Sequence, residues 1–273
     1  MVLCATPIGN LEDITRRALR TLDEADAVAC EDVGRTRKLL SHFGVGVKRL
    51  VVLNEGNERR QAGGLVARMV GGETVALVSD AGMPGLSDPG FHLVRSALDA
   101  GVDVEVVPGP TAVVSALVVS GLPPARFVFE GFLPRKRGER RRRAQELADE
   151  RRTLVLFVSP HKLEETLEDL VVAWGDRPAA LVRELTKLHE EVRREGLSAL
   201  LAHAREHPAR GELVLVVSGA IHEHRHEPPP EELARMATGL MRSGMDRKEA
   251  LATVAHETGV ARRRVFDALV DSD

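Results

Sequence analysis

Apolar residues follow two alternating spacings along the chain, one typical of buried strands and the other of helices that face a core. Short apolar runs predict strands near residues 2–6, 27–30, 50–53, 74–78 and 102–107. Between them, apolar residues three or four positions apart predict helices, as at Ile14, Ala18 and Leu22. Strands and helices that alternate in this way favour a mostly parallel sheet with helices on both faces. We therefore predict a first α/β domain over residues 1–121.

The same alternation returns in the second half of the chain. Leu163, Leu167 and Leu170 have the spacing of one helical face. Apolar runs predict strands near residues 126–132, 154–158, 179–183 and 213–217. This pattern predicts a second α/β domain over residues 122–221. The expected fold class is therefore α/β, with two α/β domains and mostly parallel or mixed sheets.

The last part of the chain, residues 222–273, has a different pattern. It begins with a proline-rich linker, because consecutive prolines cannot continue a helix or a central strand. Apolar residues at helical spacing then predict two or three short helices, with turns at Gly244 and Gly259. This appendage is either a helix-turn-helix-like unit that binds nucleic acid or a packing element, and periodicity alone leaves both interpretations open.

Composition narrows the class of protein. The chain has 273 residues, of which 43% are hydrophobic, and this is enough for two folded domains. The N-terminus has no signal-peptide pattern, and no apolar run approaches the roughly 20 residues needed to cross a bilayer. We therefore expect a cytoplasmic protein with no membrane partner. The net charge of −3 does not by itself indicate nucleic-acid binding.

The sequence gives little indication of a metal-binding site. Cys4 and Cys30 lie in apolar, strand-like runs, where buried and reduced thiols are expected, and a cysteine-based metal site is excluded. His222, His224 and His226 lie in the linker without other clear ligands, so we expect exposed histidines there. No metal is expected.

The loop VSDAGMPGLSDPG, residues 78–90, follows a predicted buried strand, at the sheet edge where α/β proteins usually bind ligands. Asp88 and Pro89 fit the N-cap and first position of the next helix. Gly82 and Gly85 allow unusual backbone angles and a close approach of a ligand. Asp80 has no such structural role in the sequence pattern and could accept hydrogen bonds from a ribose or an ammonium group. The loop taken alone is also consistent with an ordinary strand-to-helix turn.

Other loops rich in glycine, proline and small polar residues end at the same edge, at residues 6–10, 30–35 and 108–111. The sequence contains neither a GxxxxGK[ST] phosphate loop nor a GxGxxG motif after a strand. ATP-driven chemistry and dinucleotide chemistry of the Rossmann type therefore lose support.

Four motifs in order carry a resemblance to a known family: ATPIGNLEDIT from Ala5, SDAGMPGLSDPG from Ser79, PGPTA from Pro108 and RELTK from Arg183. Together they resemble the tetrapyrrole methylase family, in particular its branch that methylates small-subunit ribosomal RNA. The resemblance implies two α/β domains, a homodimer and S-adenosylmethionine bound in the cleft between the domains. It also implies methyl transfer to the ribose 2′-hydroxyl of a cytidine in the decoding region of 16S rRNA in the small ribosomal subunit.

The resemblance also implies which residues bind the cofactor. Met83 stands where the family commonly has threonine, and Val158 and Lys162 also depart from the family pattern. The implied cofactor-binding residues are Ile8, Asp80, Ala81, Gly82, Met83, Thr111, Ala112, Phe157, Leu185 and Glu212.

A 2′-hydroxyl becomes a good nucleophile only when its proton leaves, so a carboxylate, lysine or histidine nearby would help. The catalytic candidates are Glu184 and Lys187, which follow a strand on the second domain's side of the implied cleft. These two residues could instead form an ion pair that orders the cleft. Secondary candidates are Glu31, Asp32 and His161.

Basic residues concentrate in two segments of this slightly acidic chain and could bind RNA phosphates through counterion release. A charge run can also be the solvated face of a helix. With no tyrosine and a single tryptophan for base stacking, recognition by shape and phosphates is expected. The candidate RNA-binding residues are Arg135, Lys136, Arg137, Arg140, Arg141, Arg262 and Arg263.

Two other functions remain open at this stage. A tetrapyrrole C-methyltransferase would share the fold and cofactor but would not need the arginine-rich segments. A non-catalytic RNA-binding factor in ribosome assembly would keep the basic segments but would not need an intact cofactor site.

Overall fold

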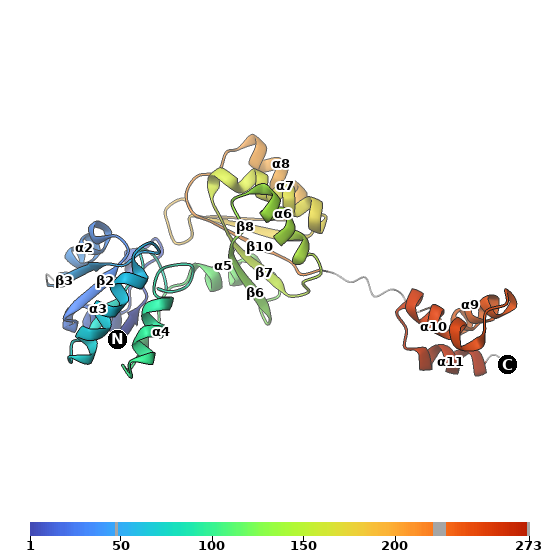
Figure 1. Ribbon diagram of the computed structural model, residues 1–273. Helices are drawn as coiled ribbons and strands as arrows, with labels where there is room; N and C mark the ends of the chain where they lie inside the picture. Colours follow the sequence, from blue (N-terminus) through green and yellow to red (C-terminus); the bar gives the residue numbers. More distant parts are fainter. Residues whose placement is uncertain (47–48, 221–227, 272–273) are drawn as a thin grey trace. The chain divides into compact units, whose positions relative to one another are not determined.

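Five parallel strands form the first sheet of the computed structural model, which describes residues 1–46, 49–220 and 228–271 (Figure 1). The strand order is β3-β2-β4-β1-β5, and each strand coincides with a predicted apolar run. The strands are β1 (Val2–Cys4), β2 (Ala27–Cys30), β3 (Arg49–Val52), β4 (Val75–Leu77) and β5 (Glu105–Val107).

Helices cover both faces of this sheet, as predicted. On one face, α1 (Arg16–Glu24) and α2 (Val33–His42) pack against a cluster that includes the buried free thiols of Cys4 and Cys30. On the other face, α3 (Glu58–Val70) and α4 (Phe91–Asp99) pack against a second cluster around Leu77. A short 3₁₀ helix, η1 (Leu11–Asp13), precedes α1.

The strand order creates a crevice between β1 and β4. The chain leaves β1 toward β2 on one side and leaves β4 toward β5 on the other, so the loops after these two neighbouring strands diverge. In open α/β sheets, ligands bind outside the carboxyl ends of the strands at such a point. The loops that begin at Thr6 and Ser79 both start there.

The second sheet is mixed. Among the described residues its order is β6-β7-β10-β8-β9, with β6 and β7 parallel and the other neighbours antiparallel. This agrees with the predicted fold class, although β9 and the helix that follows it were not predicted. The strands are β6 (Phe127–Phe132), β7 (Thr153–Val158), β8 (Pro178–Arg183), β9 (Glu191–Gly196) and β10 (Leu213–Val217).

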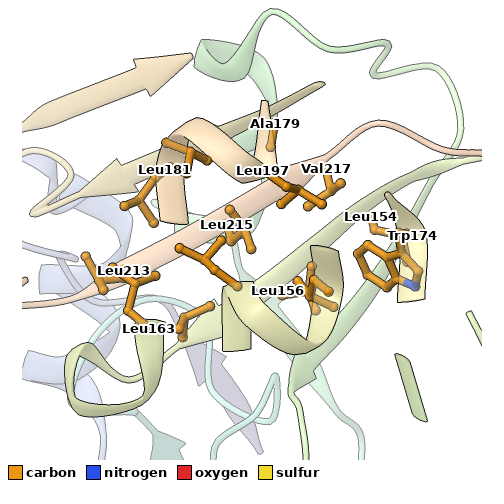
Figure 2. Close-up of a cluster of buried hydrophobic side chains, with 14 of the residues drawn as sticks. Leu154, Leu156, Leu163, Trp174, Ala179, Leu181, Leu197, Leu213, Leu215 and Val217 are labelled. Atoms are coloured by element: carbon orange, nitrogen blue, oxygen red, sulfur yellow. The ribbon is translucent and has the colours of Figure 1, made fainter. Parts of the chain in front are cut away.

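Three layers build this half of the molecule. The helices α6 (Arg137–Glu146), α7 (Leu163–Trp174) and α8 (Leu197–Glu206) cover one face of the sheet (Figure 1). Figure 2 shows alternate leucines of β7 and β10 in the cluster between this face and the helices. The helix α5 (Ala112–Ser120) packs on the opposite face, against valines of β7, β8 and β10. Both faces are therefore buried at the centre of the sheet.

The arginine-rich segment forms α6, and one of its arginines is a core residue. Arg140 is 1% exposed, and its Nε donates to Oδ2 of the equally buried Asp169 at 2.8 Å. Its Nη2 donates to Glu165 at 3.1 Å. The prediction that Arg140 binds RNA is therefore wrong, because its guanidinium is enclosed between α6 and α7 and is satisfied there.

The start of α4 differs from the prediction for Asp88. The helix begins at Phe91, and its N-cap is Gly90 with a φ of 141°. Instead of Asp88, the buried carboxylate of Glu58 on α3 accepts hydrogen bonds from Gly90 N at 2.9 Å and Leu93 N at 3.0 Å. Asp88 is thus not the helix cap, because a residue from another helix occupies that position.

Replacing Glu58 by alanine is expected to destabilise the protein. Two buried N–H groups would lose their acceptor, and each such group costs about 1–3 kcal/mol of unfolding free energy. Urea denaturation of the variant checks this value. Glu58→Gln keeps one acceptor oxygen and should retain more of the stability, so equal losses in the two variants would contradict the capping role.

The second compact unit begins at residue 221, and the first comprises residues 1–220. The described part of the second unit, residues 228–271, contains three helices with glycines between them, as predicted. Their shared core includes Leu233, Val254 and Val265. The helices are α9 (Pro230–Arg242), α10 (Arg247–Thr258) and α11 (Arg262–Val270).

Some predictions are not tested by this architecture. The two sheets lie within one compact unit, so the boundary at residue 121 stays a prediction. The linker histidines His222, His224 and His226 lie outside the described residues. Within the described ranges, none of the helices has the length and apolar character needed to cross a membrane. Side chains in those ranges form no His, Cys, Asp and Glu group suited to a metal ion.

Candidate active site

The loops after β1 and β4 are held together by their backbones. Thr6 N donates to Gly82 O at 2.9 Å, and Gly82 N donates to Thr6 O at 3.0 Å. The Thr6 hydroxyl also donates to Ser79 O at 3.1 Å. Gly82 has a φ of 83°, and a Cβ added there would stand 3.3 Å from Cγ2 of Ile8. A glycine at this position therefore lets the two loops close the crevice.

A loop from the second half of the unit reaches the same place. The backbone N–H of Asn10 donates to the Thr186 hydroxyl at 3.1 Å. A Cβ on Gly9 would lie 2.5 Å from Cγ of Lys187 and 2.9 Å from the carbonyl oxygen of Leu185. The loop after β8 therefore packs directly on the loop after β1, and Gly9 is required for this contact.

A cavity of about 400 Å³ lies beside these contacts. Such a volume is within the range of small-molecule sites. Eight of the ten predicted cofactor-binding residues line it: Ile8, Ala81, Gly82, Met83, Thr111, Ala112, Phe157 and Glu212. Further lining residues, which were not predicted, include Leu86, Ser87, Asp88, Phe132 and Ser159.

The other two predicted cofactor residues do not line this cavity. Leu185 packs with the cluster between α5 and the second sheet. Asp80 accepts a hydrogen bond from Asp32 N at 3.2 Å and pairs with Arg35 at 3.3 Å, and it faces a neighbouring cavity of about 380 Å³. The expectation that Asp80 has no structural role is wrong, because its carboxylate fixes the start of α2.

Asp88 is a candidate functional residue that sequence reasoning missed. Its half-buried side chain lines the 400 Å³ cavity. Burial, together with the negative charges of Glu31 and Asp80, raises the pKa of Asp88 to about 6, against a hydrogen bond from Ser79. A carboxyl group with a pKa close to neutrality can accept and release a proton under working conditions.

Glu184 and Lys187 form the ion pair that was considered as the alternative to a catalytic role. Lys187 Nζ lies 2.8 Å from Glu184 Oε1 and 3.2 Å from Glu212 Oε2. The hydrogen bond from Lys187 lowers the pKa of Glu184. Burial opposes the charged form of Lys187, but its bonds to Glu184 and Glu212 outweigh burial and raise its pKa. Both groups therefore hold their charges, which suits ordering of the loop better than proton transfer.

The secondary candidates have structural roles or lie outside the cavity. Asp32 is the N-cap of α2, where its Oδ1 accepts from Arg35 N at 2.9 Å. Burial, more than the nearby charge of Asp80, raises the pKa of Glu31. His161 is exposed in the short helix η2 (Pro160–Lys162).

The predicted RNA-binding residues other than Arg140 are on the surface. Several already have partners: Lys136 pairs with Glu139 at 3.5 Å, and Arg141 pairs with Asp169 at 2.7 Å. Arg137 lies 3.6 Å from both Glu168 and Asp169. Arg262 and Arg263 are exposed at the start of α11. The positive charge of α6 is therefore largely balanced by acidic neighbours.

The cavity's chemistry favours a ligand with an apolar, flat part and a positive charge. The described residues that line it include no lysine, arginine or histidine, and their titratable side chains are Asp88 and Glu212. Phe132 and Phe157 lie with ring centroids 5.4 Å apart at its wall. Such a lining suits a cationic nucleoside and does not suit a phosphate-bearing cofactor.

Comparisons with known proteins find enzymes that are similar to this chain. The family model described as Tetrapyrrole (Corrin/Porphyrin) Methylases matches residues 2–201. The chain is 42% identical over 274 residues to Ribosomal RNA small subunit methyltransferase I of Halalkalibacterium halodurans, covering 98% of this chain and 93% of the relative. It is 44% identical over 219 residues to the protein of the same name from Thermotoga maritima, covering 80% of this chain and 98% of that relative.

A solved structure shares the fold of most of this chain. The crystal structure of uroporphyrin-III-C-methyltransferase from Thermus thermophilus is 26% identical to the chain and superimposes with a TM-score of 0.57. The match covers 80% of this chain and 93% of that protein.

Proposed function

The chain belongs to the tetrapyrrole methylase family, and from this premise we propose that it methylates the ribose 2′-hydroxyl of a cytidine in the decoding region of 16S rRNA, with S-adenosylmethionine as the donor. The observation that carries the proposal is the cavity at the β1–β4 crevice, with its apolar walls and its carboxyl groups. The relatives named for small-subunit ribosomal RNA, which match nearly the whole chain, support RNA as the acceptor.

S-adenosylmethionine supplies a methyl group that its sulfonium charge has already activated for transfer. The residues present fit this cofactor, because the cavity offers apolar walls and the carboxyl groups of Asp88 and Glu212, of which Glu212 also pairs with Lys187. Asp80 and Leu185 do not line the cavity. Asp80 holds the start of α2, and Leu185 packs with the cluster between α5 and the second sheet. The residues that would hold the cofactor are Ile8, Ala81, Gly82, Met83, Thr111, Ala112, Phe157 and Glu212.

The protein's own contribution is to position the ribose, to exclude water and to remove one proton. Positioning alone can lower the barrier of a two-reactant step substantially. Apolar side chains such as Leu86 and Val158 line the cavity and limit the access of water. Asp88 accepts the proton of the 2′-hydroxyl at its carboxylate. The ion pair of Glu184 and Lys187 keeps the loop after β8 against Gly9, so these two residues act through position.

The role of Asp88 predicts a pH dependence. A carboxylate accepts a proton only in its ionised form, which predominates above the pKa of about 6. The kcat/KM of methyl transfer is therefore expected to rise with pH below about 6 and to level off above it. Initial rates across a pH series check this. A profile without an inflection near pH 6 would count against Asp88 as the proton acceptor.

RNA contacts are proposed for the exposed basic residues at the start of α6 and of α11. Phosphate contacts from these side chains would add affinity that falls with salt concentration. Arg140 is not among them, because it is buried. The proposed residues are Arg135, Lys136, Arg137, Arg141, Arg262 and Arg263.

A homodimer is proposed from exposed apolar side chains in the first compact unit. Val114 and Val118 lie one turn apart on α5 and are 47% and 65% exposed. Phe91 and Leu98 on α4 are also exposed. Exposed apolar side chains such as Val114 and Val118, which share one helix face, are typical of surfaces that bury themselves against a partner.

Tetrapyrrole C-methylation is a second candidate, favoured by the fold shared with uroporphyrin-III-C-methyltransferase. Transfer of labelled methyl from S-adenosylmethionine separates the two. Methylation-deficient 30S subunits, naked 16S rRNA and uroporphyrinogen III are offered in parallel. Label on ribosomal RNA supports the proposal. Label on the tetrapyrrole alone would keep the cofactor and overturn the acceptor, and cofactor binding without transfer to any acceptor would favour a non-catalytic role.

A further inference from the structure

A further cavity, of about 330 Å³, opens in the second half of the first compact unit and is called the arginine cavity below. Its polar walls are formed by Arg183, Glu191, Arg193, His203, His207 and Arg210. None of these side chains lines the proposed cofactor cavity. Basic side chains from two strands, one helix and one loop therefore converge on a site that methyl transfer does not use.

The sheet register explains why the strand residues share one wall. Arg183 on β8 pairs across the strands with Glu191 on β9, and Leu181 pairs with Arg193. Because side chains alternate between the two faces of a strand, these four side chains project on the same face. The end of α8 adds the stacked rings of His203 and His207, whose centroids are 4.5 Å apart. The loop after α8 adds Arg210.

The charges of this cavity are not balanced. Glu191 accepts hydrogen bonds from Arg183 Nε at 3.1 Å and from Arg193 Nη1 at 3.4 Å. Glu195 accepts a hydrogen bond from Arg193 Nη2 at 2.8 Å. Arg193 Nε is buried and has no acceptor in the described structure. Arg210 is exposed, and its side chain has no ion pair or hydrogen bond among the described residues. Of the described lining residues, three are arginines and one is a carboxylate.

Such a set favours an anion with several oxygens. Guanidinium groups donate in a planar fork that matches phosphate oxygens, and charge-assisted bonds of this kind are strong. The two cavities differ in charge, because the described residues that line the cofactor cavity include no lysine, arginine or histidine.

The two cavities are neighbours along the chain. Arg210 lines the arginine cavity, while Gly211 and Glu212, the next two residues, line the cofactor cavity. Two residues of chain span at most about 7 Å. The first residue of β10, Leu213, also lines the cofactor cavity and pairs across the strands with Arg183. A nucleic-acid strand that presents a ribose to the cofactor cavity can therefore place a nearby phosphate among these arginines.

We propose that the cavity formed by Arg183, Arg193 and Arg210 binds a backbone phosphate of the RNA substrate close to the nucleotide that is methylated. This inference rests on the proposed function and gives its RNA partner a defined contact. The salt dependence of binding provides its signature, because each phosphate that a protein neutralises contributes to the slope of log K against log salt concentration.

Arg210→Ala in the full chain tests the proposal, because this exposed side chain has no partner in the described structure whose loss would disturb folding. The association constant for methylation-deficient 30S subunits is measured by filter binding at a series of potassium chloride concentrations. The variant is expected to bind about tenfold more weakly, as for the loss of one charge-assisted contact. Its salt slope should be about 1 smaller in magnitude. The affinity for S-adenosylmethionine, measured by calorimetry, should not change.

Arg95→Ala is the matched control. It removes the same charge from an exposed position on α4 that lines neither cavity. It should leave the slope for 30S subunits unchanged. Arg210→Glu should weaken binding further than Arg210→Ala.

Three outcomes would overturn the proposal. If Arg210→Ala leaves the affinity and the slope for 30S subunits at wild-type values, the cavity does not contact RNA. If the variant loses binding of inorganic phosphate while 30S binding is unchanged, the cavity is a site for a free anion. If the wild-type protein neither binds nor methylates 30S subunits, the proposed function fails together with this proposal. If wild type methylates 30S subunits and only the effect of Arg210→Ala is missing, the phosphate-binding proposal fails alone.

Discussion

Replacing Asp88 by asparagine is expected to reduce the turnover of methyl transfer by about 10²–10⁴-fold, the range of proton-transfer catalysis by one positioned side chain. The amide has the shape of the carboxyl group but cannot accept the ribose proton. Folding should be retained, because the carboxyl group is not the cap of α4 and its charge is opposed by burial. Single-turnover rates with saturating S-adenosylmethionine measure the effect on chemistry separately from binding.

Glu212→Gln is the matched control, since Glu212 is the other titratable side chain among the described residues that line the cavity. Its carboxylate pairs with Lys187 and is not assigned to proton transfer. Turnover of this variant should stay within about tenfold of wild type, far from the loss expected of a proton acceptor. The inflection near pH 6 should persist in it and disappear in Asp88→Asn. Full turnover by Asp88→Asn would show that another group, or solvent, takes the proton.

Replacing Asp169 by alanine is expected to lower the free energy of unfolding by about 3–5 kcal/mol, because it leaves a buried arginine without its main partner. Asp169 lies at the centre of an ion cluster, with Arg140 at 2.8 Å, Arg141 at 2.7 Å and Arg137 at 3.6 Å. Arg140 would keep Glu165 at 3.1 Å, but that carboxylate is partly exposed. Denaturation in guanidinium chloride measures the loss.

Arg142→Ala supplies the comparison on the same helix. Its side chain is 73% exposed, and its pairing with Glu146 is long, at 3.9 Å. Exposed pairs of this kind contribute little, so the expected change is within about 0.5 kcal/mol. If Asp169→Ala were as stable as Arg142→Ala, the cluster between α6 and α7 would not stabilise the fold. The arginine-rich segment would then be better explained by function alone.

The parallel sheet and its ligand-binding edge could be predicted because they depend on local patterns. Strands β2 and β10 have the predicted bounds, since each is a short apolar run. The loops at Thr6 and Ser79 meet because neighbouring parallel strands end at one edge. Most predicted cofactor residues therefore line a single cavity.

Elements whose charges form specific pairs could not be predicted. Strand β9 has the sequence EVRREG, which lacks an apolar alternation. Its charged side chains instead pair with one another along the strand and with Arg183 on β8. Helix α6 has an arginine where the period would place an apolar core residue. The buried partner of Arg140 lies 29 residues further along the chain.

The proposed role of Asp88 could not be predicted for a similar reason. The motif Asp-Pro-Gly before a helix is typical of an N-cap, and the sequence does not show that Glu58 reaches the same N–H groups from α3. The contact of Gly9 with the loop at Lys187 is likewise a tertiary contact between the two halves of the unit. Pairs this far apart in sequence follow from the fold and not from local patterns.

The cavity at the β1–β4 crevice is proposed to support methyl transfer to a cytidine ribose. Nucleoside mass analysis of 16S rRNA, after reaction of methylation-deficient 30S subunits with the protein and S-adenosylmethionine, tests it most directly. We expect one new 2′-O-methylcytidine in the decoding region, present with wild type and strongly reduced with Asp88→Asn. A methyl group on a base, or on another nucleoside, or no methylation of the RNA, would contradict it.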